Sequence, residues 1–82
     1  MSKEIVKDKK LNVSLFCMAE GTEISEHTST KEGFVYVIEG DGIFNLKGKE
    51  IKMLPGVFIT LEKNITHSLT AKKNTSFLLF LS

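Results

Sequence analysis

Apolar residues along this chain follow the spacing of β-strands, and no window keeps the i, i+3, i+4 spacing of a helix for more than about one turn. Residues typical of turns recur about every eight to twelve positions, as they do in all-β sandwiches and barrels. The runs between them predict strands at residues 10–18, 22–27, 34–39, 43–47, 49–53, 57–61, 65–71 and 75–81. We therefore expect a single all-β domain over residues 1–82, in which residues 1–9 form either a flexible N-terminal arm or an edge strand.

The connections between these strands carry residues with distinct turn preferences. Gly-Asp-Gly at 40–42 predicts a tight hairpin turn. Leu-Pro-Gly at 54–56 predicts a type II turn, because Pro fixes φ at the second position and Gly accepts the positive φ at the third. Asn64 is expected to take the left-handed conformation that Asn tolerates in turns.

Several predicted strands are apolar on both faces. In the strand at 34–39, Val35 and Val37 lie on one face, and Phe34, Tyr36 and Ile38 lie on the other. A sheet with one wet face would alternate apolar and polar residues. Since a small barrel has room for only one of these faces, the sequence predicts a homodimer formed through the outer face that carries Phe34, Tyr36 and Ile38.

Composition narrows the classes of partner. The net charge is +1 and the lysines are scattered, which is not the basic stripe of a nucleic-acid-binding surface. All eleven basic residues are lysines. The absence of Arg, the usual bidentate partner of carboxylates and phosphates, weighs against an anionic ligand.

The chain also lacks the signals of export or membrane insertion. Cys17 is the single cysteine, so no intramolecular disulfide is possible. The first residues contain no long apolar run, and no stretch approaches the roughly 18 apolar residues of a membrane helix. The expectation is a cytoplasmic protein that does not associate with membranes.

Two segments of this sequence resemble the motifs of the cupin family. GTEISEH at 21–27 matches the opening Gly and the first His of the first motif, and residues 33–40 keep the spacing of its end. Gly48, followed by Leu-Pro-Gly at 54–56, resembles the start of the second motif, and His67 matches its histidine. The resemblance covers residues 10–81 and implies a double-stranded β-helix, the cupin-like jelly-roll barrel.

Cupins usually bind a divalent metal inside the barrel through two His and a Glu of the first motif and the His of the second. His27 and His67 carry over as candidate metal ligands, but Ser29 stands where the second His belongs and Gly33 where the Glu belongs. The resemblance therefore implies an incomplete metal site. Two alternatives stay open: one divalent ion (Zn, Fe, Mn, Ni or Cu) on His27 and His67, or no cofactor.

Strand alternation also predicts a pocket between two sheets. If His67 points inward, so do Ile65, Leu69 and Ala71, and a His on an apolar face needs a hydrogen-bond partner or a ligand. The absence of a side chain at Gly33 is expected to open space for a ligand. The predicted walls of the pocket are Ser29, Gly33, Val35, Val37, Phe58 and Leu69.

Other polar residues have weaker claims to a functional role. Glu32 could provide a third metal ligand if a β-bulge turned it inward, although solvated surface is its ordinary interpretation. Cys17 is better explained as a small residue buried in a strand. The two histidines could equally be structural, bonded to each other, to Ser29 or to buried water.

Three functions are compatible with these features. The leading hypothesis is a small-molecule-binding cupin domain with a degenerate metal site, its ligand unspecified. The first alternative is a metal-dependent cupin enzyme of the oxygenase or isomerase type that uses His27 and His67. The second is a dimeric structural or regulatory interaction module. The sequence assigns no catalytic residue.

Overall fold

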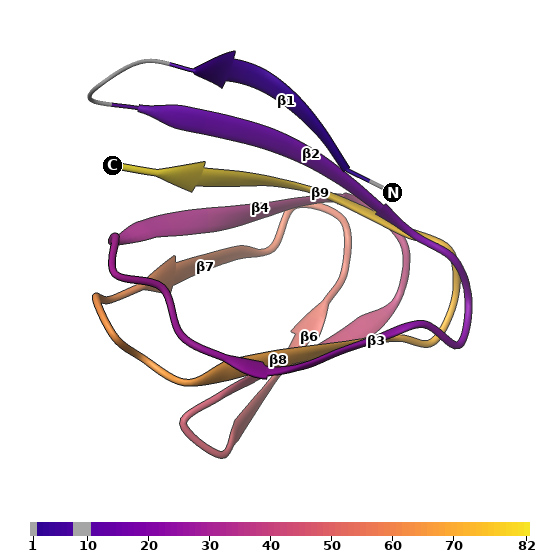
Figure 1. The fold of residues 1–82 in the computed structure, drawn as a ribbon. Helices are drawn as coiled ribbons and strands as arrows, with labels where there is room; N and C mark the ends of the chain where they lie inside the picture. Colours follow the sequence, from indigo (N-terminus) through magenta and orange to yellow (C-terminus); the bar gives the residue numbers. More distant parts are fainter. Residues whose placement is uncertain (1, 8–10) are drawn as a thin grey trace.

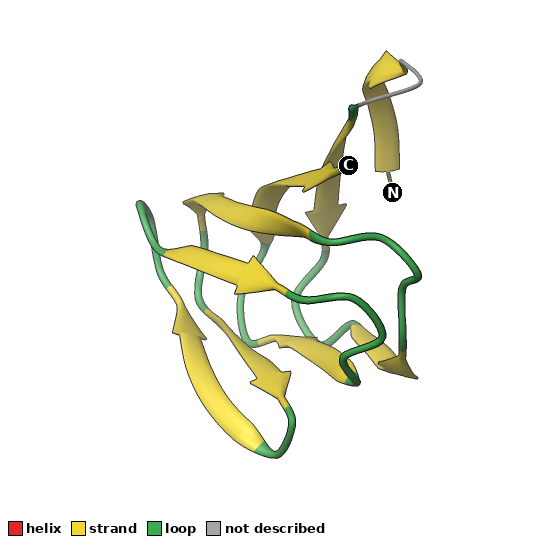
Figure 2. Ribbon diagram, turned by 90° about the vertical axis from the view of Figure 1, so that its left-hand side faces the viewer, coloured by secondary structure: helices red, strands yellow, loops and turns green. Residues whose placement is uncertain are grey.

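The chain folds into nine β-strands in a computed structural model that describes residues 2–7 and 11–82 (Figure 1). No helix occurs among these residues, and short loops join the strands (Figure 2). None of the described residues forms a helix long and apolar enough to cross a membrane. The strands are β1 (Ser2–Lys7), β2 (Asn12–Met18), β3 (Glu23–His27), β4 (Gly33–Glu39), β5 (Gly42–Leu46), β6 (Lys49–Met53), β7 (Phe58–Leu61), β8 (His67–Ala71) and β9 (Thr75–Leu81).

Two antiparallel sheets form the two layers of the fold (Figure 1). The five-stranded sheet has the order β1-β2-β9-β4-β7, and the four-stranded sheet has the order β3-β8-β5-β6. Consecutive strands repeatedly cross from one sheet to the other, which is the jelly-roll arrangement expected from the sequence. The all-β class and the two-sheet barrel are thus confirmed.

The core is the layer of side chains between the sheets. Residues of alternate parity point into it, as strand geometry requires: in β8, His67, Leu69 and Ala71 are buried, and the residues between them are half-exposed. Val37 is fully buried and Val35 nearly so, while Tyr36 on the same strand is 40% exposed. The buried cluster comprises Met18, Val35, Val37, Phe44, Met53, Ile59, Leu61, Leu69, Ala71 and Phe77.

The N-terminal residues Ser2–Lys7 form β1, which lies at the edge of the five-stranded sheet and pairs with β2. All six of its residues are exposed. The rest of the segment for which the sequence left an arm or an edge strand open lies outside the described residues. Several strand boundaries differ from expectation by one residue, and two differ by two: β2 begins at Asn12, and β8 begins at His67 because Ile65 and Thr66 belong to the preceding loop.

Two of the three predicted turns have the expected geometry. Val57 N donates to Leu54 O at 3.0 Å and Gly56 has φ of 86°, as in a type II turn. Asn64 has φ of 59°, in the left-handed region.

The prediction of a hairpin at residues 40–42 is wrong. β4 and β5 lie in different sheets, so this short segment passes between the layers. Gly40 has φ of 117°, and a Cβ on it would lie 2.5 Å from Thr75 Cα. Glycine is required there for a close crossing, because only glycine combines that φ with so near a backbone.

Thr75 fixes this crossing through its hydroxyl group. The side chain is 1% exposed, and Oγ1 accepts from Asp41 N at 3.2 Å. The same Oγ1 lies 2.9 Å from Lys73 O and 3.2 Å from Asp41 O, to which it can donate. One buried hydroxyl thus connects the turn before β9 to the link between β4 and β5.

Replacing this hydroxyl tests its contribution to stability. We expect Thr75→Val, which keeps the shape, to lower the free energy of unfolding by about 1–2 kcal/mol, because Asp41 N loses its partner in a partly buried site. Urea unfolding followed by circular dichroism measures the change. Thr70→Val, at a half-exposed position of β8, is the matched control, with an expected change within about 0.5 kcal/mol. Equal effects of the two substitutions would contradict the assignment.

Candidate functional site

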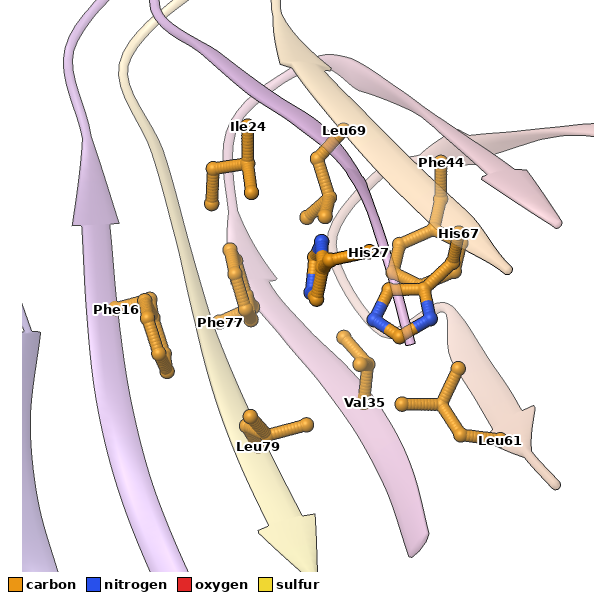
Figure 3. Close-up of a pocket in the computed structure, with 10 residues that line it drawn as sticks. All are labelled: Phe16, Ile24, His27, Val35, Phe44, Leu61, His67, Leu69, Phe77 and Leu79. Atoms are coloured by element: carbon orange, nitrogen blue, oxygen red, sulfur yellow. The ribbon is translucent and has the colours of Figure 1, made fainter. Parts of the chain in front are cut away.

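The pairing of β3 with β8 places the two histidines of the chain directly opposite each other. His27 and His67 are Cα partners in this register, which slips between Ile24 and His27. Their ring centroids lie 4.0 Å apart with an interplanar angle of 66°. Figure 3 shows the two imidazoles next to each other, with Val35, Leu69 and Phe77 around them. Two histidines forty positions apart in the sequence thus lie side by side and form one polar site.

Each imidazole is held by the backbone of its own chain segment. His27 Nδ1 lies 2.9 Å from Ser25 O, and His67 Nδ1 lies 3.1 Å from Ile65 O. Because a carbonyl oxygen only accepts hydrogen bonds, Nδ1 carries the hydrogen in both rings. In the neutral form, each Nε2 therefore keeps its lone pair and acts as an acceptor or a metal ligand. The two rings are thus held in the same tautomer, and their Nε2 atoms are the two hydrogen-bond acceptors of the site.

The two rings differ in their access to solvent. His67 is 6% exposed and stacks on Phe44, with ring centroids 5.6 Å apart and an interplanar angle of 9°. His27 is exposed, so it lies at the mouth of the site. The buried ring of His67 therefore lies in the core, and the ring of His27 lies at the surface.

Burial lowers the pKa of His67 below its ordinary value of 6.5. The hydrogen bond to the Ile65 carbonyl acts in the opposite direction, and the nearby His27 lowers this pKa further. His67 is consequently neutral at physiological pH, which preserves its acceptor nitrogen.

A small apolar cavity adjoins the histidine pair, between the two sheets (Figure 3). Its volume is about 50 Å³. Apart from the two imidazoles, every side chain around it is aliphatic or aromatic. The lining residues are Phe16, Ile24, His27, Val35, Phe44, Leu61, His67, Leu69, Phe77 and Leu79.

The structure places four of the residues predicted for the site around this cavity: His27, His67, Val35 and Leu69. Val37 also points inward, but it is packed into the core and does not line the cavity. The inward parity of β4 was therefore predicted correctly, whereas the position of the cavity along the strand was not.

Three predicted wall residues lie elsewhere. Phe58 is 58% exposed on the outer face, because Ile59 and Leu61 take the inward positions of β7. Ser29 Oγ accepts from Lys31 N at 3.1 Å, so its hydroxyl serves the loop. Gly33 opens no space for a ligand, since a Cβ there would overlap the carbonyl oxygen of Phe80.

Sequence reasoning missed the walls that other strands provide. Phe16 of β2, together with Phe77 and Leu79 of β9, closes the side of the cavity formed by the five-stranded sheet. Strand alternation could have identified Phe16, because it has the parity of the buried Met18. In β9 every residue from Phe77 to Leu81 is apolar, so its sequence carries no such signal.

The described residues do not complete a metal site of the usual kind. They contain no group of three or more His, Cys, Asp or Glu side chains placed to hold a metal ion. Glu32 is exposed, and its backbone carbonyl accepts from Ser82 N. Cys17 is half-buried beside Ser76, whose hydroxyl lies 3.6 Å from its sulfur, and it is not among the cavity residues. The histidine pair provides two nitrogens, whereas catalytic zinc usually has three protein ligands.

Two antiparallel sheets around a small cavity with inward histidines define a jelly-roll barrel with a candidate ligand site. Residues 14–81 match the family model described as "Cupin domain", and the chain belongs to the cupin family. No match was found among curated proteins.

Solved structures share the fold at low sequence identity. An RmlC-like cupin from Shewanella frigidimarina superposes with a TM-score of 0.94 at 16% identity, over 99% of this chain and 73% of that one. A conserved protein of unknown function from Streptococcus pyogenes gives 0.89 at 23% identity, over 99% and 71%. A variant of salicylate 1,2-dioxygenase from Pseudoaminobacter salicylatoxidans gives 0.91 at 20% identity, but this chain spans only 25% of it.

The lowered pKa of His67 predicts a loss of stability in acid. Well above pH 6.5 the residue is neutral in both the folded and the unfolded state and contributes nothing to the pH dependence. As the pH falls below 6.5, the unfolded chain binds a proton before the folded one does, so the free energy of unfolding decreases until the folded-state pKa is passed. Urea unfolding at pH 7.5 and pH 5.0 should therefore show a larger decrease for the wild type than for His67→Phe.

NMR titration of the imidazole protons provides the direct check. The resonance of His67 should titrate below 6.5, and His27→Gln should raise its pKa by removing the neighbouring charge. A His67 pKa at or above 6.5 in the wild type would contradict the burial of this ring.

Proposed function

We propose that this cupin domain binds a small, uncharged and largely apolar molecule that carries one hydrogen-bond donor. One observation carries the proposal: an apolar cavity between the sheets ends at two imidazoles whose Nδ1 atoms are already bonded to backbone carbonyls. An apolar pocket with a few convergent polar groups is the usual form of a small-molecule site. The apolar part of the ligand fills the cavity, and its donor group bonds to a free Nε2.

The volume limits the size of the buried part. A water molecule needs about 10–15 Å³ of such space, whereas a cavity of roughly 150 Å³ holds benzene. A cavity of about 50 Å³ therefore accepts a short aliphatic group. Anything larger must extend past the exposed His27 into solvent.

The chemistry of the two imidazoles favours a ligand with a hydrogen-bond donor over an anionic ligand. Both free nitrogens are acceptors in the neutral form, and the lowered pKa keeps His67 neutral. The cavity lining contains no Lys, and the chain contains no Arg. A carboxylate or phosphate would lose its hydration there without gaining a cationic partner.

The metal-dependent oxygenase or isomerase is the alternative function for the same residues. Its support is the bond from each Nδ1 to a carbonyl, which resembles the outer-shell contact that orients metal-binding histidines. A two-nitrogen set is incomplete for that role. We therefore place ligand binding without a metal first.

Three probes of matched size test the donor requirement. At pH 7.5, 1-butanol should shift the NMR signals of His67 and Leu69. Its isomer diethyl ether, which has no hydrogen-bond donor, should bind about fivefold more weakly, because one hydrogen bond contributes about 1 kcal/mol. Butyrate should be weaker still. The titrations are repeated with EDTA, and binding is expected to persist.

His67→Phe distinguishes the pocket from non-specific effects of the solvents. This variant keeps a ring at the site but removes the acceptor, so the preference for butanol over ether should disappear. Ser68→Ala, on the opposite face of β8, should retain it. Equal affinity of butanol and ether for the wild type, or tighter binding of butyrate, would refute the proposed ligand class.

Metal content distinguishes the two functions. Mass spectrometry after reconstitution with Fe, Mn, Ni, Zn or Cu should find well below one ion per chain, because two nitrogens hold a metal weakly. His67→Ala should show the same background. Near-stoichiometric metal in the wild type that is lost in this variant would favour the metalloenzyme instead.

A further inference from the structure

A groove on the surface of the barrel adjoins the cavity that holds the two imidazoles. Its volume is about 450 Å³, and it is open to solvent. That volume is about three times the roughly 150 Å³ that holds benzene, and it lies within the usual range of small-molecule sites. The lining residues are Ser2, Phe16, Cys17, Met18, Ala19, Thr22 and Ile24.

The cavity and the groove have two lining residues in common, Phe16 of β2 and Ile24 of β3. Figure 3 shows both side chains on one side of the cavity and His67 on the other. β2 and β3 belong to different sheets, so the boundary between the cavity and the groove lies between the two layers. The two spaces therefore meet at Phe16 and Ile24.

A register shift in β3 allows this strand to contribute two residues to the cavity. Ile24 and His27 are three positions apart, and strict alternation would turn one of them outward. The shift lies between these two residues, and both line the cavity. A local irregularity of this kind re-aims side chains. One edge strand thus places an imidazole and an apolar side chain along the border of the same cavity.

The groove suits an apolar chain better than a charged group. None of its seven lining residues is charged. Phe16, Met18 and Ile24 have large apolar side chains, and the exposed residues Ser2 and Thr22 add hydroxyl groups. A charged group in the groove would lose part of its hydration without meeting an opposite charge among these residues.

We propose that the ligand is an elongated amphiphile of the medium-chain alcohol type, whose hydroxyl group bonds to a histidine Nε2 and whose chain continues from the cavity into the groove. The inference rests on the function proposed above, since it assigns the outer part of the same ligand. A cavity of about 50 Å³ holds only a short aliphatic group. The rest of the chain passes from the mouth at His27 along Ile24 of the same strand and reaches Ala19 and Thr22.

A series of primary alcohols tests the inference at pH 7.5. Full burial of one methylene group tightens binding about fourfold. Because the groove is open to solvent, we expect about twofold per methylene, and therefore about sixteenfold tighter binding of 1-octanol than of 1-butanol. In NMR titrations both alcohols should shift the signals of Leu69, whereas only 1-octanol should shift the amide signals of Ala19 and Thr22.

Thr22→Glu places a carboxylate in the groove and leaves the cavity lining unchanged. It should reduce the gain from 1-butanol to 1-octanol to less than about threefold, because the chain would cover the carboxylate, and should leave the affinity for 1-butanol unchanged. Thr22 is exposed and bonds through its backbone to Ala19 O at 3.0 Å and Ala71 N at 2.9 Å, so the fold should persist in circular dichroism. Thr30→Glu, at an exposed loop position that lines neither space, is the matched control and should keep the full gain.

Two results would overturn this inference and leave the function proposed above intact: 1-octanol that binds no more tightly than 1-butanol, or an equal gain in Thr22→Glu and the wild type. Failure of the proposed function has a different signature, because 1-butanol would then bind no more tightly than diethyl ether. Shifts by 1-octanol confined to the exposed residues Tyr36 and Phe58 would also overturn the inference, since they would place the chain on a different apolar surface.

Discussion

Packing two sheets face to face with only 82 residues is the constraint on which the rest of this structure depends. A chain of this size has room for a single layer of inward side chains, so the same layer must provide the core and any site. Phe44 shows the overlap, because it belongs to the buried cluster, lines the cavity and stacks on His67. A change to the site is therefore also a change to the core.

This overlap explains how a histidine is accommodated among apolar groups. An unpartnered imidazole in the core would be costly, but His67 gives its Nδ1 hydrogen to the Ile65 carbonyl and stays neutral. Ile65 lies in the loop before β8, so the acceptor comes from the backbone that leads into the strand. His27 uses the same i−2 contact on β3. Local backbone geometry, repeated on two strands, thus keeps both rings in one tautomer.

The sequence was sufficient for the all-β class, most strand positions and the inward parity of Val35, Leu69 and His67, because alternation directly reflects which side of a sheet is buried. It was not sufficient for contacts that depend on which strands become neighbours. The segment at 40–42 has the composition of a hairpin, yet it crosses between sheets, and only the packing of Gly40 against Thr75 distinguishes the two. Gly33 failed for a similar reason, since the group facing it is the backbone of a strand more than forty residues away.

The departures from the cupin metal motif and the apolar cavity have a common physical consequence. With Ser29 bonded to its own loop and Gly33 pressed against β9, neither position contributes a charged group to the interior. The cavity is left with two imidazoles and apolar walls, and burial lowers the pKa of the inner one, His67. A metal ion there would need its charge balanced by ligands that these positions do not provide. The residues at these two positions are consistent with the ligand class proposed above, an apolar molecule with one donor group.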